Sequence, residues 1–191
     1  MSEFGFQGGG GSYTPPSSLN FGLFSQISSS IPIGNTVAQG SLIGLGLGSL
    51  SVPENRFNVG DSFQANMMGH LSSKNNETFR IDVWSNGVGG TLLGSTGVIT
   101  LPQTTNQHFV LELFFTIRAL GPAGGGEICS SCSFTYSKDA SNAFEGSNFI
   151  FINNTTFDTT VSNQLDIDVS FGLVNIQNQI YSDYFTLVKL F

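Results

Sequence analysis

The strongest constraint on the fold is an alternation of apolar and polar side chains over residues 108–120. Its period is two residues, as in a β-strand, where successive side chains point to opposite faces. A helix would need an apolar repeat near 3.6 residues, and no stretch of the chain carries a convincing one. The segment therefore predicts a long strand. One face of it should carry Phe109, Leu111, Leu113, Phe115 and Ile117, and the other face Val110, Glu112, Phe114, Thr116 and Arg118.

Similar alternation recurs between turns rich in Gly, Asn and Pro. Leu42–Val52 places glycine at every second position, so a bulky group or another backbone is expected to approach that bare face. Many short strands without internal repeats predict an all-β, antiparallel jelly-roll sandwich rather than an immunoglobulin-like fold or a propeller. The expected strands are 42–52, 62–71, 79–84, 91–100, 108–120, 127–136, 149–152, 156–162, 165–171 and 180–190.

The first residues differ from the rest of the chain. Gly8–Gly11 and the pair Pro15-Pro16 cannot build a packed element, so we expect a flexible Gly/Pro-rich N-terminal arm. Phe4 and Phe6 lie beyond the glycines, like a hydrophobic hook. We therefore divide the chain into an arm or anchor over residues 1–35 and a jelly-roll domain over residues 36–191.

Charged residues are scarce, and acidic ones outnumber basic ones, 13 to 6. Charged residues make up 10% of the chain, against roughly 25% in an ordinary soluble domain, and the net charge is −7. The six Lys and Arg residues are scattered, which argues against nucleic-acid binding. We also expect no membrane span and no secretory signal. An uncharged surface rich in Ser, Thr and Asn suits a packed protein–protein interface, which favours a subunit of an assembly.

No catalytic motif stands out, and we predict a protein that is not an enzyme and has no cofactor. Cys129 and Cys132 are three residues apart in an expected strand, so their side chains should face opposite ways as two ordinary thiols. His70 and His108 have no metal-ligand spacing. A calcium site is an alternative reading of the aspartates, although a polar strand face explains them more simply. These are Asp158, Asp166, Asp168 and Asp183.

The polar segment 153–171, the closing segment 180–187 and residues 50–63 resemble jelly-roll virion proteins of large DNA viruses. The general form is also similar to trimeric heads of the tumour-necrosis-factor type, whose aromatic-rich final strand lies along the trimer axis. The resemblance implies a minor capsid, spike or fibre component, often trimeric, and it transfers no catalytic residue.

We therefore expect a virion structural protein that is assembled in the host cytoplasm, associates with itself as a trimer and docks onto other capsid proteins through its arm. A carbohydrate- or receptor-binding module, using a host surface glycan or receptor, is the alternative function; its site would lie around Trp84, His108 or the acidic residues. The predicted assembly interface comprises Phe4, Phe6, Tyr184, Phe185, Leu187 and Phe191.

Overall fold

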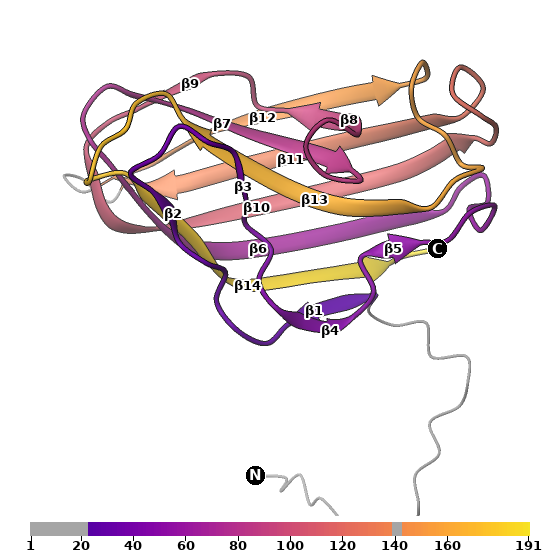
Figure 1. Ribbon diagram of the computed structural model, residues 1–191, viewed down its shortest axis with the longest axis horizontal. Helices are drawn as coiled ribbons and strands as arrows, with labels where there is room; N and C mark the ends of the chain where they lie inside the picture. The colour runs from indigo at the N-terminus through magenta and orange to yellow at the C-terminus, as the bar shows by residue number, and fades with distance from the viewer. Residues whose placement is uncertain (1–22, 139–142) are drawn as a thin grey trace, which may run out of the picture.

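The computed structural model describes residues 23–138 and 143–191, which form two antiparallel β-sheets stacked face to face (Figure 1). No helix occurs within these residues, and none of them could therefore cross a membrane as a long apolar helix. The predicted all-β antiparallel sandwich is confirmed, whereas the finer jelly-roll arrangement stays a prediction. Phe4 and Phe6 lie outside the described residues.

The larger sheet, sheet A, has eight strands in the order β12-β11-β10-β6-β14-β1-β4, with β2 paired to the end of β14. Only β10, β11 and β12 are sequence neighbours that also pair in series. The strands are β1 (Phe24–Gln26), β2 (Ile33–Gly34), β4 (Gly46–Gly48), β6 (Ser62–Ser73), β10 (Thr104–Ala119), β11 (Glu127–Ser137), β12 (Phe144–Asn153) and β14 (Gln179–Lys189).

The smaller sheet, sheet B, has six strands in the order β3-β13-β7-β8, with β5 paired to β13 and β9 paired to β7. The chain passes repeatedly between the sheets, for example from β6 in sheet A to β7 in sheet B. The strands are β3 (Gly40–Ser41), β5 (Ser51–Val52), β7 (Glu77–Ser85), β8 (Thr91–Ser95), β9 (Ile99–Leu101) and β13 (Asn163–Phe171).

The core lies between the sheets and is rich in phenylalanine. Phe109, Leu111, Leu113, Phe115 and Ile117 all point into it and so share one face, as the alternation predicted. Burying a side chain of this size contributes about 1.5–3 kcal/mol, which makes the strict alternation of β10 decisive for which way the sheet faces. The largest fully buried rings come from both sheets and are Phe79, Phe109, Phe134, Phe157, Phe171 and Phe185.

The N-terminal boundary predicted at residue 35 lies too far along the chain. β1 pairs with β14 and β4, β2 pairs with β14, and Phe24 is buried in the core. The expected close approach to the glycine-rich segment is confirmed, because a Cβ on Gly46 would meet the Phe24 ring. However, the single strand expected over 42–52 is two short pieces, β4 and β5.

Two other expected elements differ in the structure. Residues 156–162 form a loop rather than a strand, because the Asn153 carboxamide oxygen accepts hydrogen bonds from the backbone N–H groups of Thr155, Thr156 and Phe157. That side chain takes donors that a neighbouring strand would otherwise use. The strand expected over 149–152 is longer in the structure, because β12 already begins at Phe144.

Candidate functional site: the open face of sheet A

Sheet A turns one face toward the core and leaves the other uncovered by any described residue. We call this outer surface, formed by the outward side chains of β6, β10, β11, β12 and β14, the open face. Large apolar side chains lie on it: Met68 is 47% exposed, Phe114 42% and Tyr184 46%. Ile150 and Phe144 of β12 are also exposed. A monomeric surface rarely exposes so many apolar side chains over one sheet, so the open face is the leading candidate for a contact surface.

Strand register brings several of these side chains together. Val110 on β10 and Tyr184 on β14 both pair with Met68 on the β6 strand between them. Two outward positions further along β6, Phe114 on β10 and Val188 on β14 lie on either side of Gln64, with which both pair. Cross-strand neighbours of this kind lie about 4.5–5.5 Å apart at Cβ, so the apolar side chains form groups rather than isolated points.

A β-bulge in β14 determines which residues of the closing strand reach the open face. The register with β6 shifts between Ser182 and Tyr184, so that Asp183 is the extra residue and both Asp183 and Tyr184 are exposed. Gly69 lies opposite the bulge, where a Cβ atom would lie 2.0 Å from the carbonyl oxygen of Tyr181. The bulge therefore depends on glycine at this point of β6.

At one end of the open face, an aromatic row crosses three strands. His70 lies between His108, with ring centroids 4.6 Å apart, and Tyr181, with centroids 5.4 Å apart. His70 Nδ1 lies 2.7 Å from an oxygen of Asp183, and the Ser29 hydroxyl donates to the other oxygen at 2.7 Å. Ser29 bonds the carboxylate and not the imidazole, so these groups do not form a serine nucleophile with its base.

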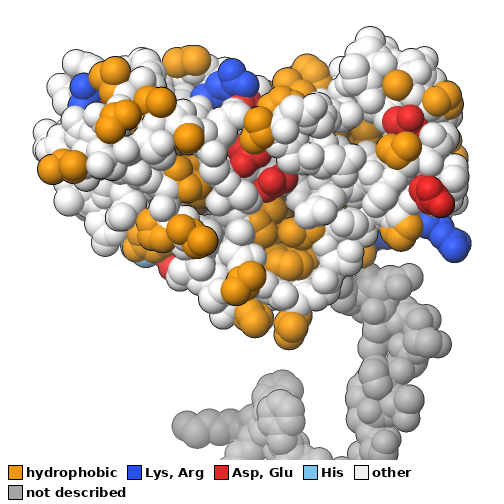
Figure 2. Space-filling model, in the orientation of Figure 1, with side chains coloured by type: hydrophobic (Ala, Val, Ile, Leu, Met, Phe, Trp, Pro, Cys, Tyr) orange, Lys and Arg blue, Asp and Glu red, His pale blue; other side chains and the backbone are white. Residues whose placement is uncertain are grey.

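Charge on the open face is sparse and mostly paired. Arg118 lies 3.5 Å from Glu127 at one end, and Asp183 is bonded to His70 at the other. Glu112 is the exposed carboxylate between them. Figure 2 views the molecule from the side of sheet B, and charged side chains are few among the uncharged atoms on that side as well. A surface of this kind can be covered without a large desolvation cost from unpaired charges.

The predicted interface residues of the closing strand divide into two groups. Tyr184 lies on the open face, and Phe191, two residues beyond the end of β14, is also exposed. Phe185 is fully buried and Leu187 is 5% exposed, both in the core. The outward face of the strand is mixed in character, because its outward positions also include Asp183 and Thr186. Phe185 and Leu187 stabilise the fold and do not reach the surface.

Trp84 and His108, the residues of the alternative ligand-binding site, lie on different sheets. His108 is on β10 in sheet A, while Trp84 is on β7 in sheet B, opposite Asp166. Trp84 is half-buried, and its indole N–H has no hydrogen-bond acceptor among the described residues. The two residues do not form a shared site.

The four aspartates also do not converge. Asp166 and Asp168 lie on the outer face of sheet B, Asp183 is on sheet A, and Asp158 lies in a loop bonded to Thr160. Within residues 23–138 and 143–191, no three His, Cys, Asp or Glu side chains are grouped so that they could hold a metal ion.

The outer face of sheet B holds a compact acidic network. Asp82 is bound by the Arg80 guanidinium, with Nε at 2.7 Å, and by the Gln39 amide at 2.9 Å. Asp168 is directly opposite Asp82, is 3% exposed, and has one oxygen without a hydrogen-bond partner among the described residues. Burial, together with the charges of Asp166 and Asp82, raises the pKa of Asp168 to about 6.

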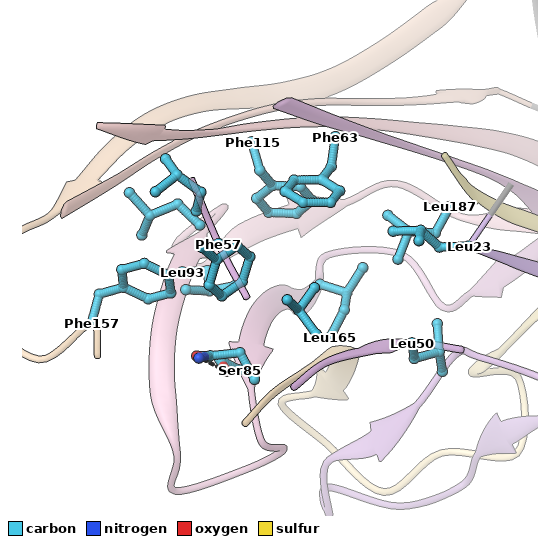
Figure 3. A pocket seen from close by; sticks show the side chains of 14 residues that line it. Leu23, Leu50, Phe57, Phe63, Ser85, Leu93, Phe115, Phe157, Leu165 and Leu187 are labelled. Atoms are coloured by element: carbon cyan, nitrogen blue, oxygen red, sulfur yellow. Dashed lines mark hydrogen bonds between the residues drawn. The ribbon is translucent and has the colours of Figure 1, made fainter. Parts of the chain in front are cut away.

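A small cavity of about 50 Å³ lies between the sheets at one end of the sandwich. Figure 3 shows the rings of Phe57, Phe63, Phe115 and Phe157 around it. Its polar lining residues, Ser85 and Asn163, hydrogen-bond to each other at 2.8 Å. No lining polar group is thus left to orient a ligand, and we interpret the cavity as a packing defect of the core.

The two cysteines are free thiols, as predicted, and lie on opposite faces of β11. Cys132 is in the core, where burial raises the pKa of its thiol to about 12. Cys129 is half-buried on the open side. A thiol with so high a pKa does not serve as a nucleophile near neutral pH.

Sequence reasoning missed the row of His70, Asp183 and Ser29. His70 and Asp183 are 113 residues apart in the chain, and neither lies in a recognisable motif. The alternation in 62–71 predicts that His70 points outward, but only the pairing of β6 with β10 and β14 brings the row together. The one available signal was Gly69, a glycine inside a strand pattern, which often marks a bulge.

Comparison with known proteins adds no relative: no protein-family model matches the sequence, and no curated protein matches it significantly.

Proposed function

We propose that the protein is a non-enzymatic structural subunit that associates with further copies of itself through the open face. The observation that carries this proposal is the exposure of Met68, Phe114 and Tyr184 on one sheet surface that no described residue covers. A second copy is the favoured occupant because the face carries little charge of either sign, so identical faces would not repel each other. A partner chosen by charge would need a complementary charged patch.

The strand order supports the jelly-roll part of the proposal. Four strands of sheet A, in the order β1-β14-β6-β10, stand over four of sheet B, in the order β3-β13-β7-β8. In chain order these eight strands alternate between the two sets except at β7 and β8, which are both in sheet B, and this pattern is typical of jelly rolls. In this interpretation β11 and β12 are a hairpin that extends sheet A and enlarges the open face.

The position of the closing strand supports a trimer with the open face inward. β14 lies inside sheet A between β6 and β1, and its outward residues include Tyr181, Tyr184 and Val188. In the trimeric heads that the sequence resembles, an aromatic-rich final strand lies along the trimer axis. A virion capsid, spike or fibre subunit is the function that unites this geometry with the low charge and the N-terminal arm.

The mass of the native particle tests self-association. At micromolar concentration, analytical ultracentrifugation should give a multiple of the 20.3 kDa chain, with a trimer expected. Met68→Glu or Phe114→Glu should convert it to a monomer, because each buries a charge in the interface. Val98→Glu is the matched control, since Val98 is 69% exposed and lies off the open face. A wild-type chain that stays monomeric would refute the proposal.

The arm has a separate test. Deleting residues 1–20 removes no described residue, so the truncated chain should keep its melting temperature. Incorporation into particles, measured by co-sedimentation, should be lost if the arm anchors the subunit to other capsid proteins. A truncated chain that co-sediments as well as the full chain would remove the anchoring role and leave self-association untouched.

A further inference from the structure

The two histidines of the chain are direct cross-strand partners on the open face. His70 on β6 pairs with His108 on β10, and the ring centroids are 4.6 Å apart. A tetrahedral ion with two imidazole nitrogens at 2.0–2.1 Å needs these nitrogens about 3.4 Å apart. Neighbouring rings at this centroid distance reach that separation by small rotations of the side chains.

Asp183 gives one of these rings a defined orientation. Its carboxylate lies 2.7 Å from His70 Nδ1 and also accepts a hydrogen bond from Ser29. A carboxylate oxygen accepts hydrogen bonds, so His70 Nδ1 donates to Asp183, and Nε2 is the ring nitrogen left for an ion. A carboxylate behind a histidine in this way is the usual outer partner of a metal-binding imidazole.

The remaining ring nitrogens are available. His70 Nε2 and both nitrogens of His108 have no hydrogen-bond partner in the described part of the chain. While the open face is uncovered, His108 is exposed and the His70 side chain is 23% exposed, so an ion from solvent can reach both. Tyr181 stacks on the other side of His70 and restricts the rotation of that ring.

We propose that His70 and His108 bind a divalent transition-metal ion such as Zn²⁺, with Asp183 as the residue that positions His70. Imidazole nitrogen suits Zn²⁺, Cu²⁺ and Ni²⁺ and is a poor match for Ca²⁺ or Mg²⁺. One copy supplies two ligands, since the described residues contain no set of three candidate side chains around an ion. Water completes the coordination, and the site does not require self-association.

Zinc titration of the full chain tests this site. The titrated chain carries Cys129→Ser, which removes the half-buried thiol as a competing ligand. Calorimetry should detect one Zn²⁺ per chain, and NMR should show both histidine rings shifting together. His70→Ala and His108→Ala should each abolish the binding, and Asp183→Asn should weaken it by about 10–100-fold.

Matched controls separate this site from non-specific binding. Asp166→Asn makes the same chemical change on the outer face of sheet B and should leave the affinity unchanged. The proposal is overturned if Zn²⁺ binding survives in both histidine variants. It is also overturned if the NMR signals of His70 and His108 in the Cys129→Ser chain do not shift with millimolar Zn²⁺. Neither outcome affects self-association, which is measured by mass without metal.

Discussion

The outer faces of the two sheets differ in the side chains that they carry. On sheet B, Arg80 and Gln39 bind Asp82, and Ser41 donates to Asp166, so the polar groups are largely satisfied within the chain. On sheet A, the open face leaves Met68, Phe114 and other apolar side chains uncovered. The difference is that sheet B pairs its polar groups within the chain, whereas sheet A leaves apolar side chains exposed, and the proposed self-association rests on this difference.

The sharpest test of this contrast compares two adjacent residues of β14. Phe185→Ala should lower the free energy of unfolding by about 3–5 kcal/mol, because the ring is fully buried and its removal leaves a cavity. Tyr184→Ala should cost about 1 kcal/mol or less in the monomer and weaken self-association instead. Chemical denaturation and sedimentation measure the two effects. Equal losses of stability would contradict the assigned orientation of the strand.

The next prediction concerns Gly69, which lies opposite the β-bulge in β14. Gly69→Ala should destabilise the fold by about 2–3 kcal/mol, because the new Cβ would collide with the Tyr181 carbonyl oxygen. The bulge would relax and the Asp183–His70 contact would be lost, which NMR of the histidine rings can follow. Gly125→Ala is the control, since a Cβ there would have no neighbour closer than 3.4 Å. A fully stable Gly69→Ala protein would show that the bulge does not need glycine.

Sheet B should respond to pH through Asp168. Its pKa is raised from 3.8 to about 6, so the folded state favours the protonated acid. The contribution of this residue to stability is therefore greatest below about pH 4 and is lost as the pH rises through about 6. Asp168→Asn should raise the free energy of unfolding by about 1–2 kcal/mol at pH 8 and change it little at pH 4. A difference that is the same at both pH values would exclude this explanation.

The smallest effect is expected from the ion pair at the end of the open face. Arg118 and Glu127 lie 3.5 Å apart and are partly exposed. Arg118→Gln should change the free energy of unfolding by less than about 0.5 kcal/mol. If urea denaturation shows that the free energy of unfolding falls by more than about 1 kcal/mol, the ion pair stabilises sheet A more than an exposed pair usually does.

Local patterning predicted the fold class well because burial acts residue by residue along a strand. The alternation of apolar and polar residues predicted which side chains of β10 and β13 share the buried face. The glycines at every second position of 42–52 predicted that a bulky group approaches there, as the Phe24 ring does at Gly46. The errors arose where a side chain replaced a strand partner, as Asn153 does in the 153–157 turn. The arm boundary failed because β1 and β2 are too short to show a period.

The sequence by itself determined that this protein is an all-β sandwich with a phenylalanine-rich core and little charge. Those properties follow from which residue types occur at alternate positions. Only the tertiary structure decided that Phe185 and Leu187 face inward, that Asp183 and Tyr184 both face outward, and that His70 meets His108. The physical reason is that the bulge and the cross-strand row depend on the pairing of β14 with β6 and of β6 with β10, strands that are far apart in the chain.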